Sequence, residues 1–121
     1  MTKNQITALF DQWNEALQTG EPKKVSALYH SEAILLPTIS DIIRHNHEEI
    51  EDYFVHFLSK CPVGNIDESN VRIYDKLAIN SGSYTFTFKD GSQAQARFTF
   101  VYQWDGESWL IIEHHSSKMP G

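Results

Sequence analysis

The sequence predicts one α+β domain spanning residues 1–121, in which about three N-terminal helices pack on one face of a curved, mostly antiparallel sheet. Two observations predict this class. Apolar residues recur every three or four positions in the first half of the chain, whereas from Ile66 onward they alternate with a period of two. Tight-turn sequences separate the alternating segments, as expected for a meander of antiparallel strands. With 121 residues, 40% of them hydrophobic, the chain can bury the core of a single domain.

The first two helices are predicted from apolar spacing and from helix-end signals. Residues 2–18 place their apolar side chains on one helical face, and Gly20 is a suitable stop. Glu21-Pro22 opens a short second helix, since proline is tolerated in the first turn, and this helix ends near Ser31.

Short extended segments and a third helix follow. Residues 33–36 and 42–44 are expected to form edge strands. Asn46 is a favourable N-cap, and Glu49 three residues later completes a capping-box sequence, so a third helix is expected to begin here and to end before Pro62.

The second half is predicted to be a meander of long strands. Turns are expected at Asp75-Lys76, at residues 89–92 and at Asp105-Gly106. The turn at 89–92 is the strongest, because its Asp-Gly pair readily adopts the positive φ angles of tight turns. The last strand is expected over residues 109–115.

One strand of the meander, residues 94–104, carries an aromatic stripe that has two interpretations. Either the stripe belongs to the core, or the sheet uses one large face for the core and the other for contact with a second subunit. Because exposed apolar sheet surface marks contacts, we expect a homodimer or higher homo-oligomer through the sheet. The stripe lies on the side of the strand opposite Arg97, and its members are Phe98, Phe100, Tyr102 and Trp104.

Charge and cysteine content exclude several classes of protein. Ten Lys and Arg against sixteen Asp and Glu give a net charge of -6, so a nucleic-acid partner is not expected. Cys61 is the single cysteine, which allows no internal disulfide and favours a reducing compartment. The N-terminal residues do not resemble a signal peptide, and no stretch has the length of a membrane span. The sequence therefore predicts a cytoplasmic protein without a membrane partner.

Arginines between apolar neighbours are the first candidate site residues. Arg97 lies within a predicted central strand, where a buried guanidinium needs either a carboxylate partner or a bound anion. An ion pair is the structural explanation, whereas a small acidic ligand bound by the guanidinium fork is the functional one. Arg44 and Arg72 raise the same question.

Histidines are the second group of candidates. His45 and His47 lack further ligands at a defined spacing, and His114 and His115 point to opposite faces of a strand, so no metal site and no cofactor is expected. By regular alternation His115 shares a face with Glu113, and it is a candidate general acid or base, or a hydrogen-bond donor to a ligand.

Several segments together carry a family resemblance that covers nearly the whole chain. They read YHSEA at 29–33, AINSG at 78–82, ARFTFVY at 96–102 and HHSSKMP at 114–120. The order of elements resembles the nuclear transport factor 2-like (SnoaL-like) superfamily. The segments most closely resemble the bacterial stand-alone relatives of the association domain of calcium/calmodulin-dependent protein kinase II. The resemblance implies a cone-shaped domain whose strongly curved sheet wraps the first helix, with a pocket at the mouth and dimerisation through the sheet.

The resemblance also implies candidate functions and site residues. Arg97 is the best match to a pocket arginine, His115 lies in the matching terminal strand, and Arg44 is a weaker match. The chain has no kinase catalytic domain, so we expect a homo-oligomerising domain that binds a small acidic metabolite without kinase activity. One alternative is a SnoaL-like cyclase or isomerase that uses His115 or Glu113 for proton transfer. Another is an assembly module with a vestigial pocket.

Overall fold

The computed structural model describes residues 2–38 and 40–120. Its sheet has the strand order β1-β5-β4-β3-β2, in which β1 runs parallel to β5 and the other neighbours are antiparallel. The predicted α+β class and the mostly antiparallel sheet are confirmed. The elements are α1 (Lys3–Gln18), α2 (Pro22–Ser26), β1 (Tyr29–Leu36), α3 (His47–Phe57), the 3-10 helix η1 (Leu58–Lys60), β2 (Val63–Tyr74), β3 (Leu77–Thr87), β4 (Gln93–Trp104) and β5 (Trp109–Lys118).

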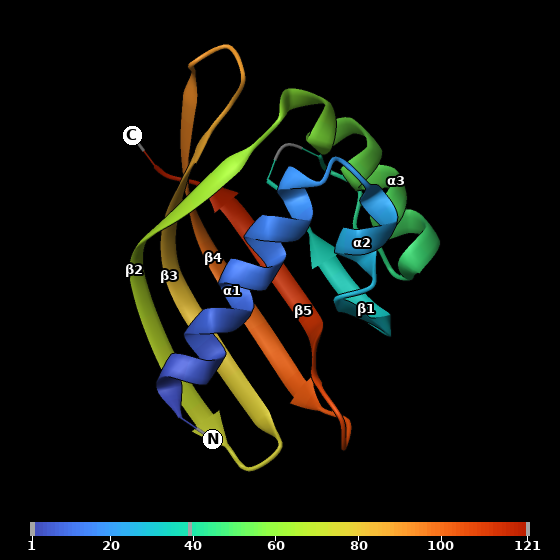
Figure 1. Cartoon of the computed structure of the whole chain (residues 1–121), viewed down its shortest axis with the longest axis vertical. Helices are drawn as coiled ribbons and strands as arrows, with labels where there is room; N and C mark the ends of the chain where they lie inside the picture. The colour runs from blue at the N-terminus through green and yellow to red at the C-terminus, as the bar shows by residue number, and fades with distance from the viewer. Residues whose placement is uncertain (1, 39, 121) are drawn as a thin grey trace.

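The sheet curves around α1, which lies lengthwise across its concave face, while α2 and α3 lie beside β1 (Figure 1). Thr2 caps α1 reciprocally with Gln5, and the helix buries a single apolar face against the sheet. That buried face consists of Ile6, Phe10, Trp13 and Leu17. None of the helices in residues 2–38 and 40–120 is long and apolar enough to cross a membrane.

The aromatic stripe of β4 belongs to the core. Phe98, Phe100 and Tyr102 are at most 3% exposed, and Phe10 and Trp13 of α1 pack on Phe100. Trp104 is half-buried and packs on Trp109 at a centroid distance of 5.7 Å. The interpretation of this stripe as a contact surface is therefore wrong for its three buried rings, which already belong to the core. Dimerisation through the opposite face of the sheet stays a prediction.

A bulge in β5 decides which of its side chains face the core. Val101 pairs with Glu113 but the next residue, Tyr102, pairs with Ile111, so Ile112 is an extra residue without an opposite partner. Beyond it the alternation is shifted by one position. Ile111 and His114 therefore both face inward and are buried, whereas Glu113 is exposed.

Several segments differ from the sequence-based expectation in their extent. The last strand continues past the expected His115 to Lys118. The second helix ends at Ser26, before Ser31, because the Ile111 N–H donates to Leu28 O at 3.0 Å and draws the following residues into β1. β1 accordingly begins at Tyr29. Residues 42–44 form only an isolated bridge, in which Arg44 exchanges two backbone hydrogen bonds with Leu35.

The backbones of β2 and β3 approach each other very closely near a second bulge. A Cβ atom on Gly82 would lie 2.0 Å from the backbone oxygen of Glu68, at the point where the register shifts between Ile66 and Glu68. Only glycine fits at this close approach.

Candidate functional site

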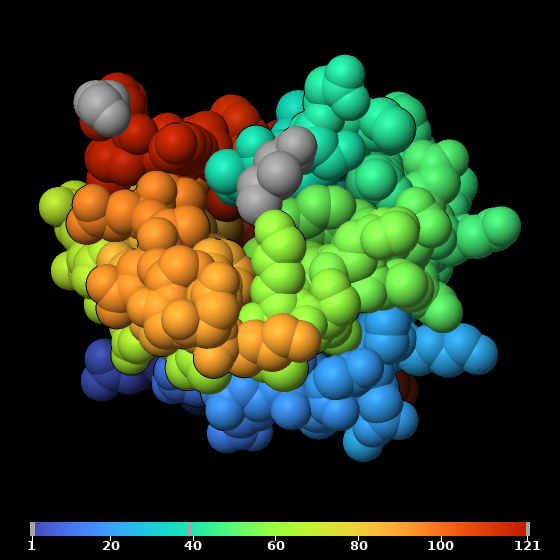
Figure 2. Space-filling view, turned by 90° about the horizontal axis from the view of Figure 1, so that it is seen from above, coloured from blue at the N-terminus to red at the C-terminus, as the bar shows by residue number. Residues whose placement is uncertain are grey.

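The candidate site is a cavity of about 700 Å³ between α3 and the inner face of β3, β4 and β5. The cavity lies at the end of the molecule where the β3–β4 hairpin, the C-terminal segment and the segment before α3 come together (Figure 2). The walls are largely aromatic: Trp13, Tyr53, Phe54, Phe57, Tyr84, Phe86 and Phe88. The polar lining comes from Thr38, Gln93, Gln95, His114, Ser116 and Lys118.

A chain of hydrogen bonds runs from the core to the cavity wall. The Nε1 of Trp13 donates to the Oη of Tyr29 at 3.1 Å, and that Oη lies 2.8 Å from Nδ1 of His114. On the other side of the ring, Nε2 of His114 lies 3.3 Å from the Oη of Tyr84, which donates to Ser116 Oγ at 2.6 Å. Four elements of the fold thus meet in one buried polar network.

The indole and the bond from Tyr84 to Ser116 together set the direction of this chain, since Tyr84 gives its own proton to Ser116 and must accept one from His114 Nε2. Because Trp13 Nε1 can only donate, the Tyr29 hydroxyl accepts from it and uses its own proton toward Nδ1 of His114. The imidazole proton then lies on Nε2 and points to Tyr84. Ser116 Oγ accepts from Tyr84 and also from the Thr38 hydroxyl at 2.6 Å, so its own proton is left to donate to a group in the cavity.

The interior of the site is electrically neutral at physiological pH. Burial, with a smaller contribution from the charge of His115, lowers the pKa of His114 to about 3. Burial likewise raises the pKa of Tyr53 to about 12 and that of Tyr29 and Tyr84 still further. The buried groups therefore offer hydrogen bonds and aromatic faces but no charge.

The structure places the strongest sequence candidates outside this cavity. Arg97, Glu113 and His115 are exposed on the outer face of the sheet, and none of them lines the cavity. The expectation that Arg97 points into the cone is wrong, because its strand turns the aromatic stripe inward. For His115 the cause is the bulge at Ile112, which reverses the side expected from regular alternation. A ligand-binding or catalytic role for these residues stays a prediction that concerns the outer face.

The polar residues that line the cavity, among them His114, Ser116 and Lys118, were not chosen as site residues from the sequence. His114 takes the inward position expected for its neighbour, and Ser116 follows it on the same side. Lys118 at the rim is the cationic group among the lining residues that the structure describes. The uninterrupted apolar run of residues 109–112 was a usable signal, since it breaks the period of two from which the facing of the later residues was counted.

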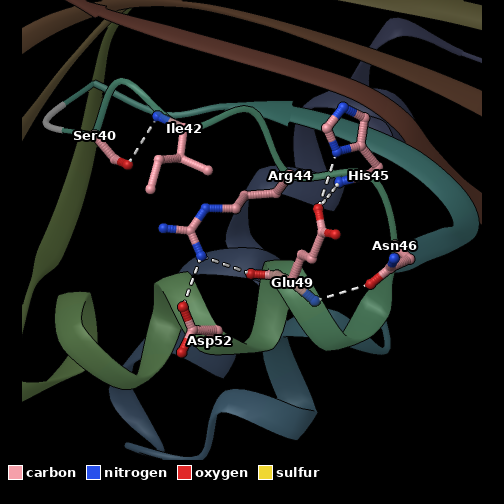
Figure 3. Close-up of polar contacts among 7 residues, drawn as sticks. All are labelled: Ser40, Ile42, Arg44, His45, Asn46, Glu49 and Asp52. Carbon is pink, nitrogen blue, oxygen red and sulfur yellow. Dashed lines mark hydrogen bonds and ion pairs between the residues drawn. The ribbon is translucent and has the colours of Figure 1, made fainter.

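Arg44 is the arginine that the fold buries. Its Nη1 donates to the backbone oxygen of Glu49 at 3.0 Å and pairs with Asp52 at 2.8 Å (Figure 3). Its guanidinium carbon lies 5.7 Å from the centre of the Tyr53 ring. The ion pair considered for Arg97 is thus made by Arg44, at the start of α3 and beside the cavity.

The histidines are held by other interactions. Nδ1 of His45 lies 2.9 Å from the Glu49 carboxylate. Because this carboxylate contacts His45, Asn46 caps α3 through its own side chain, which accepts the N–H of Glu49, and the expected reciprocal capping box is not formed. Within residues 2–38 and 40–120, no group of three or more His, Cys, Asp or Glu side chains is arranged to hold a metal ion.

The fold is that of the nuclear transport factor 2-like proteins. An NTF2-like protein from Pseudomonas putida superposes with a TM-score of 0.83 at 18% identity, over 95% of this chain and 84% of that one. An NTF2-like protein with a cystatin-like fold from Novosphingobium aromaticivorans superposes with a TM-score of 0.81 at 8% identity, over 98% and 82%.

Within that fold, the chain belongs to the calcium/calmodulin dependent protein kinase II association domain family, whose sequence model matches residues 2–120. A protein from Xanthomonas campestris described as such an association domain has 49% identity and a TM-score of 0.95, over 99% of this chain and 89% of that one. The search of curated proteins finds no match. The resemblance drawn from the sequence motifs is confirmed.

Proposed function

We propose that the protein is a cytoplasmic, homo-oligomerising domain without kinase activity that binds a small molecule in the aromatic cavity. The observation that carries this proposal is the combination of a 700 Å³ aromatic cavity with the hydroxyl of Ser116, which accepts two hydrogen bonds and keeps its own proton for a ligand. Ligand sites are commonly concave, mostly apolar and fitted with a few polar groups that set orientation.

The lining suggests the chemistry of the ligand. A flat apolar body suits the rings of Tyr84 and Phe86, and a hydrogen-bond acceptor suits Ser116. The expected acidic group has a counter-charge in Lys118, at the exposed rim. An aromatic or unsaturated carboxylic acid, with its acid group at the mouth, satisfies all three.

The same lining favours binding over proton transfer. His114 has its pKa lowered to about 3 by burial, so it is a weak base at neutral pH. No carboxylate is among the described residues that line the cavity. A cyclase or isomerase that relies on His115 or Glu113 would need a substrate on the outer face of the sheet.

Oligomerisation is proposed through that outer face. The family is named for association, and the inner face is already covered by α1. The outer positions of β3 and β4 include half-buried Ile79 and Val101 among polar neighbours, and Arg97 and His115 would then lie where a second copy packs.

The binding proposal is tested by calorimetry with benzoate and cinnamate, and with benzamide as the uncharged analogue. Ser116→Ala is expected to weaken all three ligands about fivefold, since it removes one hydrogen bond. Lys118→Gln should weaken only the two acids, by about threefold, because exposed ion pairs are weak. Ser117→Ala and Arg97→Ala on the outer face should change nothing.

Two results would contradict the proposal. One is binding that persists in Ala96→Phe, which places a ring in the cavity, while that variant keeps the wild-type circular dichroism. The other is the absence of heat for all three ligands at concentrations above about 1 mM, the level at which a binding free energy of about 4 kcal/mol is half-saturated. The proposed oligomerisation is tested separately by light scattering, and a protein that stays monomeric up to high concentration would contradict it.

A further inference from the structure

The outer face of the sheet carries an apolar patch on the half of the strands that lies away from the β3–β4 hairpin. Along β3 and β4 its side chains alternate with buried ones, so they point away from α1, which lies against the inner face (Figure 1). None of them is among the partly buried residues that pack against the core. This outer apolar patch consists of Ile34 of β1, Tyr74 of β2, Leu77 and Ile79 of β3, Val101 of β4, and Leu110 and Ile112 of β5. Contiguous apolar surface of this kind marks a contact.

Two charged side chains stand at opposite ends of one row that crosses the patch. The row runs over four strands, from Glu113 of β5 through Val101 and Ile79 to Arg72 of β2, each residue paired with the next. Neighbouring strands are about 4.8 Å apart, so the two charged residues are roughly 14 Å apart and too distant to pair within the chain. Both are exposed, and neither makes an ion pair with another residue that the structure describes.

This order of side chains is complementary to itself under one two-fold rotation. Two sheets that pack face to face keep their strand directions within about 30° of each other. An axis along the strands, between β3 and β4, places β4 over the partner's β3 and β5 over the partner's β2. Val101 then packs on Ile79 of the partner subunit, and Glu113 reaches Arg72 of the partner subunit. Symmetry makes each of these contacts twice.

Other two-fold axes in the plane of this face fit the side chains less well. An axis along the row itself, across the strands, would set the Glu113 carboxylates of the two copies against each other, and the Arg72 guanidinium groups likewise, which repel. An axis along β4 would place Glu113 over Ile79 of the partner subunit and cover a carboxylate with an apolar side chain. Of these three axes, the one between β3 and β4 joins both charges and also covers the apolar centre.

We propose that two copies of the chain associate through the outer apolar patch about the axis between β3 and β4, with reciprocal ion pairs that join Arg72 of each copy to Glu113 of the other. This inference rests on the oligomerisation proposed above and adds its register and the residues that determine it. The charges lie at the edges of the apolar centre, where they set orientation and disfavour wrong pairings more than they add affinity. The aromatic cavity stays accessible, because it lies on the inner face of the sheet.

The apolar centre is tested by the same substitution at two valines. Val101→Asp places a charge at the centre of the contact and should weaken the dimer at least tenfold, because a carboxylate would be buried without a partner. Val55→Asp, on α3, makes the same change at a valine that is 53% exposed and should alter the dimer less than twofold. Sedimentation velocity over a concentration series measures the dissociation constant, and circular dichroism checks that both variants fold.

The ion pairs are tested by mixing two charge-reversed variants. Arg72→Glu alone and Glu113→Arg alone each set like charges against one another and should weaken the dimer about tenfold. An equimolar mixture should prefer heterodimers of nearly wild-type affinity, because both of their contacts again join opposite charges. Native mass spectrometry distinguishes the heterodimer from either homodimer by its mass. Arg97→Glu mixed with Glu113→Arg is the matched control and should show no such preference, because Arg97 lies opposite Ser83 of the partner subunit.

The possible results separate this register from the oligomerisation on which it rests. A wild-type protein that stays monomeric at every concentration would overturn both. A dimer that tolerates Val101→Asp as well as Val55→Asp would overturn the outer face as the contact. A dimer that is sensitive to Val101→Asp, with no preference for heterodimers of Arg72→Glu and Glu113→Arg, would overturn the register alone. Preferential heterodimers in the control mixture would overturn it in favour of an axis that runs across the strands.

Discussion

The two faces of the sheet differ in almost every physical property. Along β4 the inward residues Phe98 and Phe100 are buried aromatics, whereas the alternate residues Arg97 and Thr99 face outward. The inner face also holds the hydrogen-bonded chain that ends at Ser116, and the groups whose pKa is shifted by burial. The contrast shows that strand parity, more than residue type, decides which polar residue can belong to the cavity.

The largest difference is expected for stability when one side chain is truncated on each face of β4. Phe100→Ala should lower the free energy of unfolding by about 3–5 kcal/mol, because it opens a cavity beneath Trp13. Thr99→Ala on the outer face should cost under about 1 kcal/mol. Urea unfolding measures both, and similar losses would show that the faces do not differ as described.

The next contrast concerns pH. Because the pKa of His114 is about 3 in the folded protein and 6.5 is its ordinary value, the unfolded chain binds a proton that the native chain does not between these pH values. Stability therefore falls as the pH drops below 6.5, by about 1.4 kcal/mol per unit from this group, or about 2 kcal/mol at pH 5. His114→Gln should remove that slope.

The matched variant on the outer face is His115→Gln, which should keep the wild-type slope because this side chain is exposed. Thermal or urea unfolding between pH 7 and pH 5 measures the difference between the two variants. The same slope in His114→Gln as in the wild type would mean that this imidazole is not held neutral.

A smaller contrast is expected between two consecutive serines of β5. Ser116→Ala leaves the Tyr84 and Thr38 hydroxyls without their acceptor and should cost about 1–2 kcal/mol. Ser117→Ala, on the other face, should stay within about 0.5 kcal/mol. Urea unfolding would sharpen the comparison, and a larger loss at Ser117 would reverse the assigned parity.

The smallest effect is expected for Arg97→Ala. This side chain is exposed and none of the hydrogen bonds among the described residues involves it, so the free energy of unfolding should change by no more than about 0.5 kcal/mol. A loss above about 2 kcal/mol at a protein concentration where the chain is monomeric would show an interaction that the exposed position does not explain.

Local signals were sufficient for most of the fold. The apolar spacing of residues 2–18 and the Asn46 cap located two helices, since both depend on residues close in sequence. The Asp-Gly turn before Ser92 located a hairpin in the same way. Family motifs supplied the curvature of the sheet, which no short segment encodes.

The site was less predictable because its residues depend on one irregularity. Regular alternation predicts the correct side of the sheet for the residues of β5 up to Ile111. From Glu113 onward it predicts the wrong side, because Ile112 has no partner in β4. Burial of Arg44 likewise depends on a bridge to Leu35, which a pattern of neighbouring residues does not reveal. Which residues line the cavity therefore depends on pairing between distant strands, and the local propensity of each residue does not determine it.

The parallel pairing of β1 with β5 also affects the order in which the fold can form. β1 is an edge strand whose neighbour in the sheet is β5, so Tyr29 meets Ile111 only after nearly the whole chain is made. Contacts between such distant parts of a chain form slowly. During synthesis, the edge of β1 therefore stays unpaired until Trp109–Lys118 has been made, and in this interval the nascent chain is most open to aggregation.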